Sequence, residues 1–145
     1  MRFLLSETDE DRAACLELRR RVFIEEQQVP VEIERDTDDA SALHFLVCEG
    51  GVPVAVARAV DKGHGVAKIG RVAVVASRRG EGVGAELMAF VLATLTERGF
   101  TEALLSSQEP VVGFYQKLGF AVEGERFYEA NIPHFAMHKR LYSAG

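Results

Sequence analysis

The segment that most constrains the fold is a valine-rich run that passes through a glycine-rich turn into a long amphipathic stretch. Residues 68–76 read KIGRVAVVA, which is typical of a strand, and residues 77–84 read SRRGEGVG. Residues 81–98 then place apolar side chains at helical spacing along one stripe: Val83, Leu87, Phe90, Val91 and Leu95. A strand that turns directly into such a helix predicts an α/β unit in which the helix packs on a sheet.

The segment before this unit predicts two more strands. Residues 44–48 and 52–60 are apolar runs, and Gly50-Gly51 between them is a turn signal. A second turn, residues 62–65 (KGHG), leads into the valine-rich strand. Three strands joined by tight turns should form an antiparallel meander.

The segment after the helix predicts the other side of the sheet. Gly99 ends the helix, and residues 101–106 form a strand that should run parallel to the valine-rich strand through a right-handed crossover. Residues 110–119 favour a short helix that begins near a proline and ends at a glycine. The last two strand candidates are residues 120–127 and 135–141.

The N-terminal third adds a short strand and a helix. Residues 2–5 are apolar, and Thr8 is a good cap for a helix that runs to about Glu26. Residues 28–41 are polar and acidic, and form either a loop or a short second helix. Together these elements predict an α/β fold: a mixed, mostly antiparallel, twisted sheet of six or seven strands with about four helices.

Length and composition exclude several classes of protein. A chain of 145 residues predicts one domain over residues 1–145, and a net charge of −5 argues against a nucleic-acid binder. No apolar run reaches the roughly 18 residues of a membrane span, and the N-terminus is no signal peptide, so we expect a cytoplasmic protein. Cys15 and Cys48 sit among apolar residues and are expected to be buried free thiols. The absence of CxxC and HExxH leaves no basis for a metal site.

The glycine-rich turn has the composition of a phosphate-binding loop. Glycines let a backbone approach a ligand closely, and the N–H groups that begin a helix attract phosphate oxygens. Arg78 and Arg79 would add positive charge. The turn has neither the GxGxxG spacing of dinucleotide-binding folds nor the GK[ST] ending of a P-loop, so another phosphate-containing ligand is indicated.

Two motifs identify the kind of ligand. The pattern Arg79-x-x-Gly82-x-Gly84, after a strand and before a helix, resembles the coenzyme A turn of the GNAT superfamily of acyl-CoA-dependent N-acyltransferases. Residues 113–120 (GFYQKLGF) resemble a second signature of that superfamily. Scattered residues are similar to its small ElaA-like branch: Arg21, Val22, Phe23, Glu26, Gln27, Pro30, residues 69–74 and residues 132–134.

The resemblance implies acetyl-CoA as co-substrate and a set of residues that contact it. The Val72 carbonyl and the Val74 N–H would pair with extended pantetheine, and the Val74 N–H would also stabilise negative charge on the thioester oxygen. Gln108 stands where many members of the superfamily have asparagine, and keeps an amide. The implied cofactor-binding residues are Val72, Ala73, Val74, Arg79, Gly80, Glu81, Gly82, Val83, Gly84, Gln108, Phe114, Tyr115 and Lys117.

Proton transfer requires an acid and a base. The resemblance makes Tyr115 the acid that protonates the departing thiolate, because a phenol keeps its proton at neutral pH. Glu26 and His134 are candidate bases on the acceptor side, with His134 expected in a turn between the last two strands. His44, a third candidate, begins an apolar strand and fits a structural role better. The acidic run through residues 32–39 would either attract a cationic amine or form a solubilising loop, and the loop is the simpler interpretation.

These expectations favour an N-acetyltransferase that moves an acetyl group from acetyl-CoA to a primary amine of a small molecule or peptide by direct attack. Two alternatives stay open at this point. One is a non-catalytic acyl-CoA-binding or regulatory module, and the other is a transferase that uses a different acyl-CoA donor. The sequence allows a homodimer but defines no interface, and it does not identify the amine.

Overall fold

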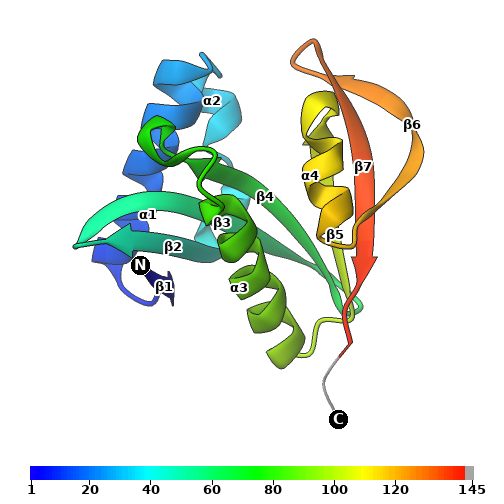
Figure 1. Cartoon of the computed structure of the whole chain (residues 1–145), viewed down its shortest axis with the longest axis horizontal. Helices are drawn as coiled ribbons and strands as arrows, with labels where there is room; N and C mark the ends of the chain where they lie inside the picture. The colour runs from blue at the N-terminus through cyan, green and yellow to red at the C-terminus, as the bar shows by residue number, and fades with distance from the viewer. Residues whose placement is uncertain (143–145) are drawn as a thin grey trace.

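One seven-stranded sheet forms the centre of the molecule in a computed structural model that describes residues 1–142 (Figure 1). The strand order is β1-β2-β3-β4-β5-β7-β6. The strands are β1 (Arg2–Leu5), β2 (Leu43–Glu49), β3 (Val52–Gly63), β4 (Val66–Val74), β5 (Glu102–Gln108), β6 (Ala121–Glu129) and β7 (Ile132–Arg140). The α-helices are α1 (Asp9–Arg19), α2 (Val31–Glu34), α3 (Val83–Glu97) and α4 (Val112–Lys117). The predicted fold class is confirmed, and so are the meander and the crossover, since β4 and β5 alone are parallel neighbours among the described strands.

The two parallel strands pair only at their beginnings. The register joins Val66, Ala67 and Lys68 of β4 to Glu102, Ala103 and Leu104 of β5, and the strands continue beyond these pairs without contact in the ladder. The Gly65 carbonyl fastens this end, because it accepts hydrogen bonds from the N–H groups of Thr101 and Glu102 at 2.8 and 3.2 Å. Figure 1 shows β4 and β5 diverging from this closed end. The sheet is therefore split at the end where β4 and β5 terminate.

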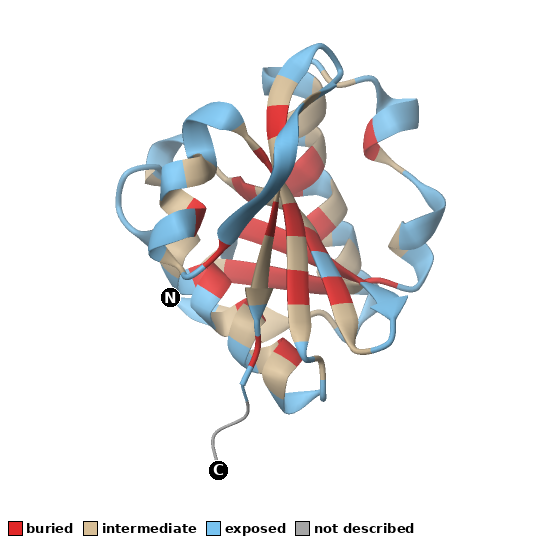
Figure 2. Cartoon of the chain, turned by 90° about the vertical axis from the view of Figure 1, so that its right-hand side faces the viewer, coloured by how far each residue is buried: buried red, intermediate tan, exposed pale blue. Residues whose placement is uncertain are grey.

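Helices cover the two faces of the sheet unequally. On one face, the buried side of α3 packs with Phe45, Ala57 and Ile69 of the meander, and with Leu105 and Met137 across the split. On the other face, α1 packs through Cys15 and Leu18, and the turn that follows it packs through Val22, on Leu46, Val56 and Ala73. Buried residues follow the central strands, whereas the edge strand β6 is largely exposed (Figure 2). The sheet thus presents an α3 face and an α1 face, and the split opens onto both.

Helix α1 begins as predicted and ends differently. The Thr8 hydroxyl accepts a hydrogen bond from the Asp11 N–H at 3.0 Å, which is an N-cap. The predicted helix does reach Glu26, but its last turns, Arg20–Glu26, are π-helical. Amphipathic spacing does not distinguish a π turn from an α turn over so few residues. Helix α3 begins at Val83, two residues later than expected, because Gly82 is still left-handed (φ 85°).

The acidic run is not a solubilising loop, and this expectation is wrong. Its residues form α2 and a 3₁₀ turn (Thr37–Ala40), and three of its carboxylates pair with three arginines. We call this set the ionic cluster: Arg19, Arg58, Arg71, Glu34, Asp36 and Asp39. Glu34 and Arg19 are its buried centre, with N···O distances of 2.7 Å and side chains 1% exposed.

The cluster stabilises the fold at neutral pH. Burial alone would raise the pKa of the Asp39 carboxyl, but hydrogen bonds from Arg19 and Arg58 hold that pKa well below its usual range. A carboxyl whose pKa is lower in the folded state contributes stability above its ordinary pKa, and this stability is lost as the pH falls. The acidic run therefore attaches the segment after α1 to the sheet.

Removal of the buried arginine should destabilise the protein strongly. Arg19→Leu leaves the Glu34 carboxylate buried without its main partner, so the free energy of unfolding should fall by about 3 kcal/mol. Arg20→Leu is the matched control, since the neighbouring Arg20 pairs with Glu17 and Glu25 on the surface and should cost at most about 0.5 kcal/mol. Urea denaturation measures both. Equal losses in the two variants would contradict a stabilising role of the cluster.

Candidate functional site

The open edge of β4 offers free backbone groups. The Val75 N–H donates to the Val54 carbonyl of β3 at 2.9 Å, and successive residues of a strand point their polar groups to opposite edges. The Val74 N–H therefore points to the edge where β5 has already diverged. This is the position in which an extended ligand could pair as an added strand.

A β-bulge in β4 determines which side chains near this edge lie on each face of the sheet. Ala73 pairs with Val56, and Gly70 with Arg58, so Arg71 and Val72 together oppose a single residue of β3. Ala67 and Ile69 pack on the α3 face before the bulge, whereas Val72 and Val74 pack there after it and Ala73 packs on the α1 face. Because of the extra residue, the side chains of β4 that face α3 are odd-numbered before the bulge and even-numbered after it.

The glycine-rich turn forms an open cradle at the end of β4. Gly80 and Gly82 have φ of 80° and 85°, and a Cβ at either position would meet no atom within 4 Å. Within residues 1–142 no side chain caps the start of α3, so its first N–H groups are available to a ligand. Gly84 is the close-packed member, since its Cβ would lie 3.5 Å from Phe114 Cζ and 3.7 Å from Val74 Cγ2. The turn has the space, the backbone donors and the helix dipole that a phosphate group needs.

The two arginines of the turn are already paired with carboxylates. Arg79 donates from Nε to the Val74 carbonyl at 2.9 Å, and from its terminal nitrogens to both Glu26 oxygens at 2.5 and 2.9 Å. Arg78 lies 2.8 Å from a Glu49 oxygen. We expected both arginines to offer unpaired positive charge to phosphates, but in the structure both are paired with carboxylates. Arg79 instead connects the phosphate-type turn, the end of β4 and the end of the π-helical segment.

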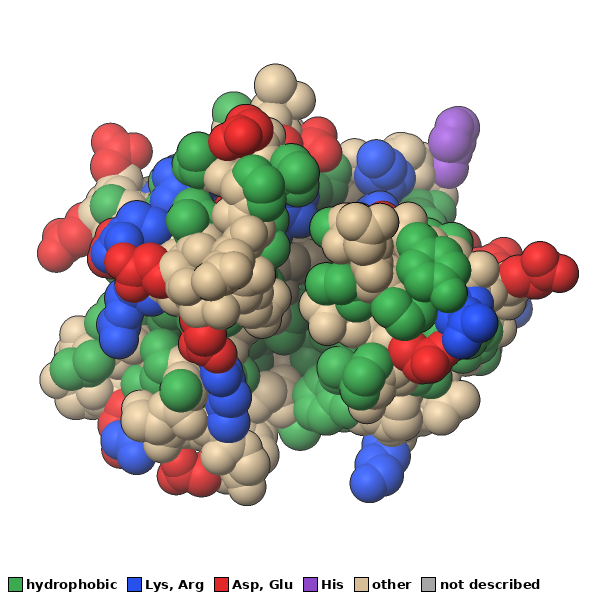
Figure 3. All heavy atoms as spheres, turned by 90° about the horizontal axis from the view of Figure 1, so that it is seen from above, with side chains coloured by type: hydrophobic (Ala, Val, Ile, Leu, Met, Phe, Trp, Pro, Cys, Tyr) green, Lys and Arg blue, Asp and Glu red, His purple; other side chains and the backbone are tan. Residues whose placement is uncertain are grey.

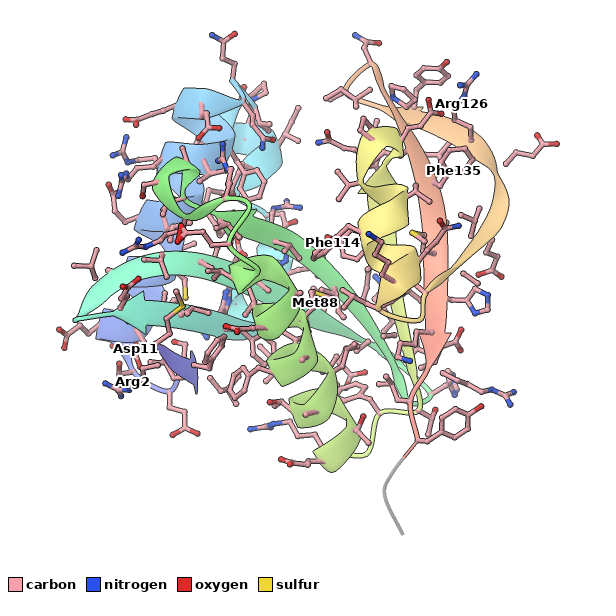
Figure 4. The ribbon with its side chains drawn as sticks, viewed as in Figure 1. Arg2, Asp11, Met88, Phe114, Arg126 and Phe135 are labelled. Atoms are coloured by element: carbon pink, nitrogen blue, oxygen red, sulfur yellow. The ribbon has the colours of Figure 1, made fainter. Side chains whose placement is uncertain are left out.

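Tyr115 lies in α4 on the α3 face of the split. Its ring packs edge-on against Phe114 and Phe120, with centroid distances of 5.0 and 6.0 Å. Phe114 in turn points from α4 toward α3 (Figure 4), in agreement with its contact at Gly84. Burial raises the pKa of the Tyr115 phenol to about 12, so the hydroxyl keeps its proton at neutral pH. The hydroxyl is thus held in its protonated form, which is the form that a proton donor requires.

His134 lies inside β7, and its expected place in a turn is wrong. The turn is formed by Ala130 and Asn131, both with positive φ. His134 pairs with Gln108, the last residue of β5, and its ring stacks on Phe127 with centroids 5.9 Å apart. The ring is nearly buried, at 8% exposure.

The contacts of His134 fix its neutral tautomer. Its Nδ1 lies 2.8 Å from the Ile132 carbonyl oxygen, which can only accept, so Nδ1 donates and Nε2 carries the lone pair. The Glu129 carboxylate lies 3.8 Å from Nε2 and would stabilise the ring once it is protonated. His134 therefore presents a basic nitrogen with a carboxylate beside it.

The other two candidate bases are occupied or buried. Hydrogen bonds from Arg79 lower the pKa of the Glu26 carboxyl, which weakens Glu26 as a base. His44 is 2% exposed and donates from Nε2 to the Asp39 carbonyl at 2.9 Å, and burial lowers its pKa. The structural role expected for His44 agrees with this environment.

A hollow brings donor-side and acceptor-side elements together. Seen from above, the surface is hollowed between the part that carries α1 and α2 and the part that carries α4, β6 and β7 (Figure 3). Gln108 lies at the end of β5, and Lys117 is exposed at the end of α4. Gly80, Glu81 and Gly82 are exposed in the turn. Val83 is the first residue of α3, and its side chain is buried.

Two cavities of the described chain can be compared with the site residues expected from the sequence. A cavity of about 300 Å³ lies between the π-helical segment and the end of β4, and Glu25, Glu26, Val75 and Ala76 contribute to its lining. A larger one, about 500 Å³, lies near Arg2 and Asp11 (Figure 4), and none of the predicted site residues is in the part of its lining that the structure describes. The larger cavity therefore does not coincide with the site residues expected from the sequence.

Sequence reasoning missed Arg71, whose side chain reaches from the β4 bulge to α2. Its signal was present in the sequence, since Arg71 interrupts the apolar run of the valine-rich strand. The alternation of a strand does not show a bulge, and so the direction of this side chain was not predictable.

The fold is that of GNAT acetyltransferases. The family model described as "Acetyltransferase (GNAT) domain" matches residues 5–141, and the chain belongs to this family. It is similar to the uncharacterized protein YyaT of Bacillus subtilis (strain 168), with 36% identity over 137 residues, covering 92% of each chain. An acyl-CoA N-acyltransferase structure from Pseudomonas aeruginosa has a TM-score of 0.86 at 29% identity, covering 95% of this chain and 98% of that one.

The resemblance to the ElaA-like branch is also confirmed. The ElaA protein of Escherichia coli (strain K12) is 35% identical over 136 residues, which cover 90% of this chain and 88% of that protein. Its crystal structure has a TM-score of 0.84 and covers 95% of this chain and 97% of that one. No helix within residues 1–142 combines the length and apolar character needed to cross a membrane.

Proposed function

We propose that this acyltransferase moves an acetyl group from acetyl-CoA to a primary amine of a small molecule or peptide. The observation that carries the proposal is the open edge of β4. Within the described chain, this strand leads through a turn with left-handed glycines to the start of α3, which no side chain caps. Pantetheine is extended and carries amides that can pair with such an edge, and the pyrophosphate of coenzyme A suits the turn that follows. The Pseudomonas aeruginosa relative, an acyl-CoA N-acyltransferase by name, supports the same donor class.

The donor would be held mainly by backbone groups. Arg78 and Arg79 are paired, so the N–H groups of residues 80–84 would bind the phosphates. Val72 and Val74 would pair with pantetheine, and the Val74 N–H would donate to the thioester oxygen as negative charge develops there. Ala73, Gln108, Phe114 and Lys117 complete the set of expected contacts.

The transfer is a direct displacement. The amine nitrogen forms a bond to the thioester carbonyl carbon, the carbon–sulfur bond breaks, and the amine loses one proton while the thiolate gains one. Tyr115 would give its proton to the sulfur, since the phenol is in its protonated form when the thiolate departs. The donated proton returns to Tyr115 from solvent.

His134 would take the amine proton at Nε2. Its tautomer leaves that nitrogen basic, and the Glu129 carboxylate would stabilise the imidazolium that forms. Glu26 is the weaker candidate for this step, because its carboxylate is held by Arg79. Glu26 would instead fix the arginine of the coenzyme A turn.

Coenzyme A binding should depend on the turn. Gly82→Glu places a side chain and a negative charge in the cradle, and affinity should fall by about 100-fold or more through lost charge-assisted hydrogen bonds. Gly99→Glu is the matched control, since Gly99 has a similar φ of 91° and open space at the other end of α3. Calorimetry with coenzyme A should separate the two variants, while pantetheine without the nucleotide should bind neither. Equal affinities would refute the cradle as the phosphate site.

Loss of the Tyr115 hydroxyl should lower kcat without weakening the binding of acetyl-CoA. In Tyr115→Phe the ring packing on Phe114 and Phe120 is kept, so the affinity for acetyl-CoA should change little. The kcat should fall by roughly 10²–10⁴, the contribution of a general acid. Release of the coenzyme A thiol in a screen of amines measures this. Weaker binding with unchanged kcat would make the hydroxyl an anchor, and an inactive wild type that still binds coenzyme A would favour the non-catalytic module.

A base at His134 should be replaceable by a small molecule. His134→Ala should lower kcat by about 10²-fold, and added imidazole should restore part of it, because the base then comes from solution. His138→Ala, four residues along the same strand and partly buried, is the control and should keep its activity. An activity loss that imidazole leaves unchanged would assign His134 a packing role.

A further inference from the structure

The bulge of β4 carries a strained arginine. Arg71 has φ of 51°, a left-handed conformation that favours glycine. The other non-glycine residues with positive φ in the described chain, Gln28, His64, Ala130 and Asn131, lie outside helices and strands. A side chain kept in such a conformation within a strand suggests a function for that side chain.

The guanidinium of Arg71 caps the end of α2. Its Nε donates to the Glu34 carbonyl at 3.1 Å, and its Nη2 lies 3.2 Å from the Ile33 carbonyl and 3.0 Å from that of Glu34. The last carbonyls of a helix have no partners within the helix, and an arginine satisfies them while it opposes the helix dipole. Nη2 also lies 3.1 Å from the Asp36 carboxylate.

Helix α2 depends on such external support. It has only four residues, and a single turn has little stability of its own. Val31 and Ile33 are 52% and 56% exposed, so its apolar side chains contribute little packing. Among the described residues, the only other side chain that donates to the last carbonyls of α2 is Arg19, from Nη2 to the Glu34 carbonyl at 3.0 Å.

We propose that Arg71 is a positioning residue that fixes α2 as the wall of the acceptor site opposite β6 and β7. The inference rests on the proposed function, since it needs an amine in the hollow of Figure 3. Arg71 directly precedes Val72, where the expected contacts with the donor begin. One residue thus sets the distance between the strand that holds the thioester and the helix that faces the amine.

A pair of variants separates positioning from stability. Arg71→Gly removes the guanidinium and relieves the backbone strain, whereas Arg71→Ala removes the guanidinium and keeps the strain. The glycine variant should therefore be the more stable of the two. Both should show the same rise in KM for the amine, on the order of 10-fold, because both lose the cap of α2. The affinity for coenzyme A should stay within about twofold of the wild type, since the turn and the open edge are unchanged.

Hydrogen–deuterium exchange gives a readout that needs no turnover. Residues 31–36 should exchange faster in both variants than in the wild type, while residues 80–86 should exchange at the wild-type rate. Arg71→Lys keeps one donor group and should restore part of the protection and part of the KM.

The outcomes are distinct. An amine KM that recovers in Arg71→Gly along with stability, or unchanged exchange in residues 31–36, overturns the positioning role of Arg71. A wild-type chain that releases no coenzyme A with any amine overturns the proposed function, and with it α2 as an acceptor wall, whatever the exchange shows.

Discussion

The incomplete pairing of β4 with β5 is the constraint on which the rest of the structure depends. A buried strand edge must satisfy its N–H and C=O groups, and here the ladder ends after three residue pairs. The closed end is held by Gly65 and Thr101, and the core on the α3 face continues across the split through Leu105 and Met137. The fold is thus stable while one edge stays open. An extended donor with amides of its own would satisfy that edge in the way a strand does, so the coenzyme A proposal rests on the sheet rather than on any single side chain.

Charged side chains in this protein mostly build the framework around that edge. Arg79 is held by Glu26 and the Val74 carbonyl, and Arg71 is held by the carbonyls of α2. These two arginines flank residues 72–74 and both reach toward the segment that follows α1. Negative phosphates would accordingly be bound by oriented backbone N–H groups, whose positions are set by left-handed glycines and by the start of α3. The ionic cluster then explains the acidic run, since its carboxylates pair with arginines of α1, β3 and β4 and attach α2 to the sheet.

Most of the framework could be predicted from the sequence because it follows from local periodicity. The strands, their tight turns, the crossover and the glycine cradle all have signals within a few residues, and the structure places them as expected. The bulge at Arg71, the π-helical turns before Gln27 and the position of His134 inside β7 do not have such signals. Each depends on what packs or pairs from a distant part of the chain, and an arginine in an apolar run looks the same whether it faces solvent or caps a helix. The pairing of Arg79 with Glu26, 53 residues apart, could not be seen for the same reason.

The two halves of the proposed reaction are therefore encoded by different kinds of information. The donor side uses backbone groups, so it needs only a bulge, an open edge and glycines at the right positions, and short motifs reveal it. The acceptor side uses side chains on α2 and on the β6–β7 hairpin, where Ile33 and Tyr128 are exposed at 56% and 63%. Such side chains can change without strain on the sheet, because they take no part in its core. A fixed donor site beside an acceptor wall of variable side chains would let the same fold serve different amines. Arg71 would have to be kept for this, because it joins β4 on the donor side to α2 on the acceptor side.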